Sequence, residues 1–285
     1  MEAIAVRALT KSYGSFEALK GVEMSVPQGA VYGLLGPNGA GKSTLIKALV
    51  GALRPSGGEM RVLGLDPLRD RSQLRRCIGY MPQSAALYGD LSARDNVRFF
   101  GSAHGLPDLD RRVREVLEFT DLSDRAGDAI HTFSGGMKRR VSLACVLVHR
   151  PRVLFLDEPT AAVDPGLRAR FWTTFRDLAD DGVTLFISTH LMDEALLCDE
   201  VAVLRQGRII IHDTPKGILE RGLTRVVVRR SGQGCEEHII GGHPEDLAQA
   251  LRSYGLAQDV DAVEVRRDTL ETVILSLIER EEVRV

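Results

Sequence analysis

One eight-residue segment, Gly36-Pro-Asn-Gly-Ala-Gly-Lys42-Ser43, constrains this 285-residue chain more than any other feature. It has the pattern Gly, four free positions, Gly, Lys and then Ser or Thr, between the apolar run Val31–Leu35 and a helical pattern over Ser43–Val50. In such a strand, loop and helix unit, glycines let backbone N–H groups turn inward around a polyphosphate, and the helix adds its positive end. The segment therefore predicts a polyphosphate site, with an ordinary glycine-rich turn as the alternative.

Two acidic residues at the end of a second apolar run supply chemistry that suits such a site. Asp157 and Glu158 directly follow Val153-Leu-Phe-Leu. Beside a phosphate loop, an Asp at a strand end can hold magnesium together with the Ser43 hydroxyl, and the next residue, a Glu, can polarise an attacking water. Lys42 would reach the β- and γ-phosphates. Because apolar runs that end in acids are common, the pair is informative only together with the loop.

A second candidate anion site begins at Ser134. Ser134-Gly135-Gly136 opens a long apolar helix that continues through Val148. The hydroxyl and the free N–H groups would point outward, with the helix dipole behind them. The alternative is that Ser134 is a plain helix cap. Two anion sites with a single acid pair raise the question of how both could serve one ligand.

Continuous apolar runs separated by helices predict an α/β fold. Val31–Leu35, Val153–Leu156 and Val183–Ser188 are uninterrupted, and Asp164 followed by Pro165 is typical of a helix start between the last two. Strands that are apolar throughout indicate a mostly parallel sheet covered on both faces.

Changes of pattern along the chain predict two domains. The first spans residues 1–221 and includes a helical insert at about 85–150 and a hairpin over 201–211 that turns at Gln206-Gly207. Residues 222–285 form a small α+β accessory domain, with the boundary placed to within several residues. We expect its strands at 225–229, 237–240 and 262–266 and its helices at 244–254 and 269–280.

Composition excludes several other classes of protein. Lys plus Arg number 37 and Asp plus Glu number 39, so the net charge of −2 gives no global basic field, and we expect no nucleic-acid partner. The four cysteines are far apart in the sequence, which fits a reducing compartment and offers no zinc or redox motif. No stretch resembles a signal peptide or a membrane span. We expect a cytoplasmic protein.

Six elements occur together in one order: the phosphate loop, Gln83, Ser134-Gly-Gly, Asp157-Glu158-Pro159, Asp164 and His190. This set resembles the nucleotide-binding domain of an ATP-binding cassette (ABC) transporter, and the resemblance covers about residues 3–215. It implies an ABC ATPase fold with an antiparallel N-terminal β part and a helical subdomain, and it implies ATP and Mg²⁺ as cofactors. In that family two such domains face head to tail, so that the Ser134-Gly-Gly of one chain would cap the γ-phosphate held by the other.

The resemblance also implies a role for each matching residue. Tyr13 would stack on adenine, Gln83 would touch magnesium or the attacking water, Glu158 would be the general base, and His190 would orient the γ-phosphate and the water. Asp164 would shape the dimer seam as well as capping its helix. The nucleotide would contact Tyr13, Gly36, Pro37, Asn38, Gly39, Ala40, Gly41, Lys42, Ser43, Thr44, Ser134, Gly135 and Gly136, and the metal would contact Ser43, Gln83 and Asp157.

Two segments depart from the usual pattern of the family. Phe133 and Met137 flank Ser-Gly-Gly where Leu and Gln are usual, and Ala161-Ala162-Val163 lacks the usual Gly and Leu before Asp164. Neither departure removes an atom that would contact phosphate, so we expect hydrolysis to be retained. The effect we expect is a changed affinity between the two copies.

Local sequences such as Ser-Gly-Gly-Met-Lys-Arg-Arg and Thr189-His-Leu-Met-Asp-Glu-Ala resemble the multidrug and antibiotic-resistance export branch, whose ATPase is a separate polypeptide. The resemblance implies an ATPase subunit held on the inner face of the cell membrane by a transmembrane permease, working as a homodimer or with a paired ABC subunit. A soluble ABC protein that acts on ribosomes or nucleic acid is the alternative, and a phosphate-loop kinase is a third. The accessory domain could regulate, dimerise or brace the ATPase.

Overall fold

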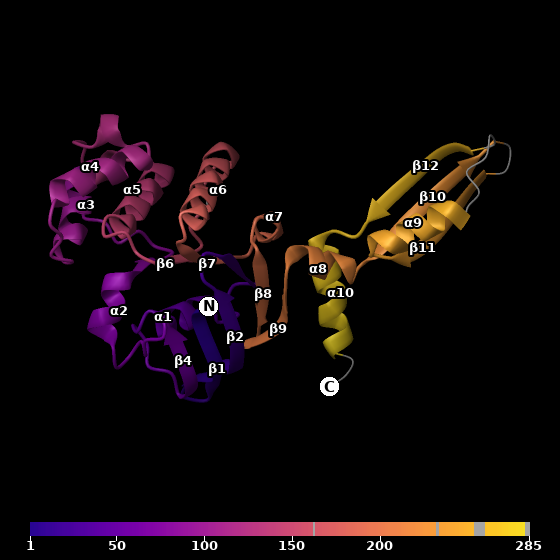
Figure 1. Ribbon diagram of the computed structural model, residues 1–285, viewed down its shortest axis with the longest axis horizontal. Coiled ribbons are helices and arrows are strands. Elements are labelled where there is room, and N and C mark those ends of the chain that lie inside the picture. The colour runs from indigo at the N-terminus through magenta and orange to yellow at the C-terminus, as the bar shows by residue number, and fades with distance from the viewer. Residues whose placement is uncertain (162, 232–233, 254–259, 283–285) are drawn as a thin grey trace. The chain divides into compact units, whose positions relative to one another are not determined.

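The computed structural model describes residues 1–161, 163–231, 234–253 and 260–282, and the chain divides into two compact units, residues 1–212 and 213–285 (Figure 1). The division falls before the boundary expected near residue 221. The reason is that helix α8 (Pro215–Glu220) packs against α10 (Leu270–Glu282) and therefore belongs to the second unit. Among the described residues, no helix is long and apolar enough to cross a bilayer.

A six-stranded sheet forms the centre of the first unit, in the order β5-β6-β7-β3-β8-β9. The first five of these strands are parallel, as the apolar runs predict. The last, β9, follows β8 through Gln206-Gly207, both of which have positive φ. The strands are β3 (Val31–Leu35), β5 (Ile78–Met81), β6 (Val153–Asp157), β7 (Thr184–Thr189), β8 (Glu200–Arg205) and β9 (Arg208–Asp213).

The N-terminal strands form a separate antiparallel sheet, in the order β2-β1-β4, with β1 at Glu2–Tyr13, β2 at Phe16–Pro27 and β4 at Gly57–Val62. Their buried residues join those of helix α1 (Lys42–Leu49) and of the central sheet in one apolar core. The phosphate loop therefore starts from a strand and enters a helix that are both fixed by this core.

Three helices with a core of their own make up the helical subdomain: α3 (Ala93–Ser102), α4 (Leu109–Phe119) and α5 (Gly135–Leu147). They stand together in Figure 1. The remaining α-helices of the first unit are α2 (Arg71–Cys77), α6 (Pro165–Asp180) and the single turn α7 (Met192–Ala195). Helix α6 begins where the sequence predicts, because the Asp164 side chain accepts a hydrogen bond from Leu167 N at 2.9 Å.

The second unit has a three-stranded antiparallel sheet in the order β11-β10-β12, together with α8, α9 and α10. The bounds are β10 Leu223–Arg230, β11 Gly234–Gly241, α9 Pro244–Ser253 and β12 Val260–Arg267. The expected helix end at Tyr254 lies outside the described residues. Leu270, Val273 and Ile274 of α10 are buried, so this apolar face packs within the protein's own core.

Candidate active site

The phosphate loop lies tightly against two neighbouring backbones. A β-carbon at Gly36 would lie 2.3 Å from the carbonyl oxygen of Leu204, and one at Gly41 would lie 2.7 Å from that of Ala18. Gly41 also has φ of 111°, which residues with side chains rarely adopt. Both positions therefore need glycine for a structural reason. This close packing against two backbones distinguishes the segment from an ordinary glycine-rich surface turn.

Lys42 is buried, with 5% of its surface exposed, and is held by the loop that precedes it. Its ammonium group donates hydrogen bonds to the carbonyl oxygens of Gly36 at 2.7 Å and Pro37 at 3.2 Å. It also lies 3.3 Å from Oε1 of Glu158. The cation predicted to bind phosphate and the carboxylate predicted to be the base thus form one buried ion pair.

Three other residues that the sequence analysis predicts for the site lie against the Glu158 carboxylate. Besides Lys42, its carboxylate accepts a hydrogen bond from Nε2 of Gln83 at 3.0 Å, and Nδ1 of His190 lies 3.5 Å from Oε2. Glu158 has φ of 49°, an uncommon value for a residue with a side chain. Its N–H donates to both the carbonyl and the hydroxyl oxygen of Ser188, at 3.1 and 3.0 Å, and these bonds hold the strained backbone.

Asp157 is buried beside Glu158, and its Oδ1 accepts a hydrogen bond from the Ser188 hydroxyl at 2.5 Å. The residues expected to hold magnesium are thus a carboxylate, the Ser43 hydroxyl and the Gln83 amide. These oxygen donors fit Mg²⁺, which commonly takes one or two carboxylates and completes its shell with phosphate oxygens and water. The described residues contain no group of three or more His, Cys, Asp or Glu placed around a metal, and a site of this kind does not need one.

A buried carboxylate that the sequence analysis did not select, Glu194, ties the two site loops together. It accepts hydrogen bonds from the hydroxyl groups of Thr160 and of Thr189, the latter at 2.6 Å. Arg168 Nε lies 3.7 Å from its Oε1. Glu194 does belong to the segment Thr189-His-Leu-Met-Asp-Glu-Ala, which the sequence analysis quoted. Only the fold shows that it joins the residues after Asp157-Glu158 to those around His190.

The pKa values of two further side chains are shifted by burial and by the charge of the acids. Burial, together with the nearby Asp157 charge, raises the pKa of Tyr80 to about 12, so its phenol remains protonated at neutral pH. Burial also lowers the pKa of Arg139, a residue of α5, while Glu158 and Asp157 oppose that shift. The helical subdomain therefore places a cation within electrostatic range of the acid pair.

Ser134, Gly135 and Gly136, which we call the lid segment, begin helix α5 at a separate place on the first unit. Ser134 Oγ accepts a hydrogen bond from Met137 N at 3.3 Å, so the residue does cap its helix. Among the described residues, no hydrogen bond or ion pair joins the lid segment to the phosphate loop. Phe133 is buried in the helical subdomain and Met137 packs against the same core, so the two departures beside the lid segment are accommodated there.

Tyr13 lies at the end of β1, opposite Phe16 across the turn to β2. Half of its surface is exposed, and Lys11 Nζ lies 4.9 Å from the ring centroid. The exposed ring is compatible with stacking on a base, and no contact links it to the acid pair.

The second segment that departs from the usual family pattern is Ala161-Ala162-Val163. Its Val163 is buried, whereas Ala162 lies outside the described residues.

A parallel sheet with a phosphate loop and an adjacent acid pair defines a phosphate-loop nucleotide hydrolase. The family model described as "ABC transporter" matches residues 19–161. A daunorubicin resistance ATP-binding protein of Streptomyces coeruleorubidus is 37% identical over an alignment that covers 96% of this chain and 95% of that relative. This chain belongs to the ABC transporter family, as one of its ATP-binding proteins.

Other relatives differ in length or have known structures. A probable multidrug ABC transporter ATP-binding protein of Escherichia coli K12 is 41% identical over 74% of this chain, which spans 37% of that relative's length. The cbiO1 protein of Clostridium perfringens, part of the cbiONQ ABC transporter complex, has a TM-score of 0.70 at 34% identity, over 76% of this chain and 90% of its own. An ATP-binding cassette solved as a dimer with ADP and phosphate has a TM-score of 0.69 at 25% identity, over 74% and 98%.

Proposed function

We propose that this chain is the ATPase subunit of a membrane exporter, bound to the inner face of the cell membrane through a separate permease, and that it acts on ATP as a pair of copies. The observation that carries the proposal is the convergence of Lys42, Gln83 and His190 on the Glu158 carboxylate. ABC ATPases hydrolyse ATP to drive transport, and this arrangement contains the groups that such hydrolysis requires.

Each of these residues has a distinct task in hydrolysis. Glu158 accepts a proton from the attacking water, and Gln83 and His190, which contact its carboxylate, orient the base and the water. Lys42 and the amides of the phosphate loop stabilise charge that develops on the γ-phosphate. Magnesium, when bound, neutralises phosphate charge, and Asp157, Ser43 and Gln83 are the residues that would hold it.

The lid segment explains why two copies are proposed. It forms the N-terminus of α5, and within the part of the chain that the structure describes no hydrogen bond or ion pair joins it to the phosphate loop of its own chain. An exposed helix N-terminus is suited to an anion. If the lid segment of one copy contacts the γ-phosphate on the other, each reaction centre contains two chains. The dimeric relative bound to ADP and phosphate supports this arrangement.

A mixed complex tests the two-chain centre. One partner carries Lys42→Ala, which disables its phosphate loop, and the other carries Ser134→Arg, which disables its lid segment. Each variant alone is expected to be inactive, whereas the mixture contains one intact centre per heterodimer. Roughly a quarter of wild-type ATPase activity should return, because random pairing gives half heterodimers with one working centre of two. A mixture no more active than the separate variants would refute the shared centre.

A groove of about 750 Å³ is where we place the permease. It is lined by α2, the start of β5, the end of α3 and the last turns of α5, and Arg75 and Arg76 are exposed at its rim. Strand β5 leads directly to Gln83, which contacts Glu158. A permease segment seated in the groove would therefore touch the strand that positions a residue of the reaction centre, which provides a path from hydrolysis to transport.

Copurification from detergent-solubilised membranes tests the partner. The wild-type chain is expected to carry an integral membrane protein with it, and Arg75→Glu combined with Arg76→Glu should reduce the recovery at least about 5-fold by reversing the charge at the groove. Arg114→Glu, an exposed position on α4, is the matched control and should leave recovery unchanged. Recovery of ribosomes or nucleic acid in place of a membrane protein would favour the soluble alternative. The exported compound, a drug, an antibiotic or a lipid-like molecule in this proposal, is recognised by the permease.

A further inference from the structure

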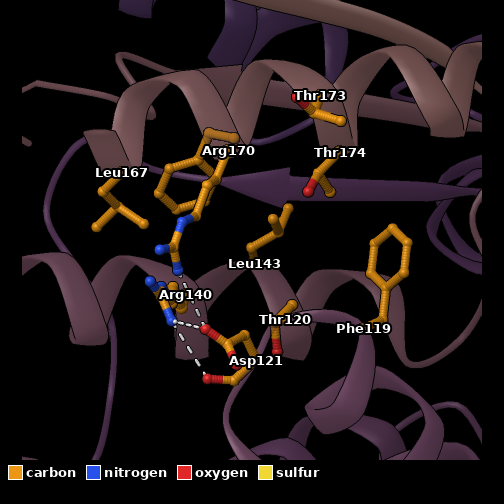
Figure 2. A pocket seen from close by; sticks show the side chains of 10 residues that line it. Phe119, Thr120, Asp121, Arg140, Leu143, Leu167, Arg170, Thr173 and Thr174 are labelled. Atoms are coloured by element: carbon orange, nitrogen blue, oxygen red, sulfur yellow. Dashed lines mark hydrogen bonds and ion pairs between the residues drawn. The ribbon is translucent and has the colours of Figure 1, made fainter. Parts of the chain in front are cut away.

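Helix α5, which begins with the lid segment, and helix α6 lie side by side with an incompletely filled space between them (Figure 2). They touch closely near their starts, where a β-carbon on Gly136 of the lid segment would lie 2.6 Å from Leu167 Cδ2. Further along, a cleft of about 450 Å³ opens, bordered by apolar side chains of both helices and by the end of α4. Along this stretch the two helices are therefore not close-packed against each other.

Asp121 bridges this cleft at its open side. It follows α4 and lies beside α5, where Arg140 Nη1 donates to its Oδ2 at 2.8 Å and to its backbone carbonyl at 3.2 Å. The same Oδ2 faces Arg170 Nη1 of α6 at 3.4 Å. Figure 2 shows both guanidinium groups directed at this carboxylate. Among the described residues, the Asp121–Arg170 pair is the one polar link between α6 and residues 85–150.

The two halves of the bridge differ in burial. The Arg140 side chain is 19% exposed and holds Asp121 to α5 through two acceptors, whereas Arg170 and Asp121 are 70% and 75% exposed. The link to α6 is therefore the weaker half, and salt screens an exposed pair of this kind. Without the carboxylate, two arginines would face each other across the cleft and repel.

We propose that the Asp121 carboxylate clasps α5 to α6 and thereby positions the lid segment at the surface that meets the second copy. Arg140 lies four residues after Gly136 on the same helix, so the orientation of α5 about its contact with Leu167 sets the direction of the lid segment. Asp121 and Arg170 are positioning residues: they touch neither the acids nor the phosphate loop. The inference rests on the proposed two-chain ATPase and adds to it a device that sets the affinity between copies.

The test measures ATP hydrolysis as a function of protein concentration for the full chain and for Arg170→Ala. We expect the concentration that gives half-maximal activity to rise about 3- to 10-fold, because each closed dimer has two clasps and an exposed pair is worth a factor of at most about five. The plateau rate should stay within about two-fold of wild type, because the reaction centre is intact. Above about 0.5 M salt the two curves should converge.

Matched variants separate a clasp from a general loss of stability. Arg170→Lys keeps the charge and should restore most of the affinity, and Asp121→Asn should shift the curve further than Arg170→Ala. Arg98→Ala breaks an exposed pair with Asp110 inside the helical subdomain and should have no effect. An unchanged half-maximal concentration for Arg170→Ala, or an equal shift for Arg98→Ala, would overturn the clasp alone. A wild-type chain whose activity per molecule does not depend on concentration would instead refute the proposed two-chain ATPase.

Discussion

Lys42→Ala is expected to lower ATP hydrolysis at saturating ATP at least about 100-fold, the size of effect that follows the removal of one donor to transition-state charge. In the structure the Lys42 ammonium group pairs with Glu158 and donates to the loop carbonyls of Gly36 and Pro37. The phosphates of ATP would compete with Glu158 for this cation. In the proposed mechanism Lys42 would therefore act twice, first holding the base in place and then stabilising charge on the γ-phosphate.

The measurement is the steady-state rate of phosphate release from ATP with magnesium. Lys47→Ala is the matched control, because Lys47 lies on the same helix α1 and is exposed; its rate should equal that of the wild type. Thermal melting must accompany the assay, since the substitution leaves the buried Glu158 without its cation and is expected to reduce stability. A folded Lys42→Ala protein with a rate near that of the wild type would show that Lys42 does not have the assigned role.

The linear motifs are the part of the site that the sequence could predict. A phosphate loop needs consecutive residues of fixed type, and Asp157 and Glu158 follow a strand whose burial is visible as an apolar run. Their mutual arrangement could also be anticipated, because the ends of parallel strands meet at one edge of a sheet. The roles of Gln83 and His190 toward the metal, the water and the γ-phosphate, by contrast, came from the family resemblance, and their contacts with the Glu158 carboxylate were found only in the structure.

Residues that act through tertiary contacts could not be found in this way. Ser188 bonds to both acids from a neighbouring strand, and Glu194 links Thr160 to Thr189 from a single helical turn. Glu194 stands in the segment after His190, but residue type alone does not show that either side chain makes these contacts. Strand β5 was also missed as a strand, because it has four residues and contains Gly79. That glycine is explained only by packing: a β-carbon there would lie 2.7 Å from Leu154 Cδ2 and 2.8 Å from Val146 O.

The division between the units shows the same limit. Helix α8 reads as a continuation of the first unit because it follows β9 without a flexible linker. It is assigned to the second unit by its packing against α10, a helix about fifty residues later in the chain. Local pattern gives the elements of the accessory domain closely, whereas its starting point depends on a contact between elements that are distant in sequence.

Glu158→Gln is expected to abolish turnover and to trap the ATP-bound pair. Glutamine has the shape of glutamate and can still contact Gln83 and Lys42, but it cannot accept the proton of the attacking water, so hydrolysis should fall by about 100- to 10,000-fold. ATP binding should persist, because the phosphate loop and Asp157 are unchanged. Since the proposed pair opens only after hydrolysis, a stable dimer should accumulate with ATP and magnesium and should not form with ADP.

Light scattering after size-exclusion chromatography measures the dimer, and single-turnover hydrolysis measures the chemistry in the same preparation. Glu118→Gln, an exposed position on α4, is the matched control and should hydrolyse ATP and return to the monomer. A Glu158→Gln protein that turns over normally would mean that another group takes the proton. One that binds ATP without turning over and remains monomeric would keep Glu158 as the base while removing the lid segment from the reaction centre, because a centre built from two chains must hold them together until its phosphate bond is cut.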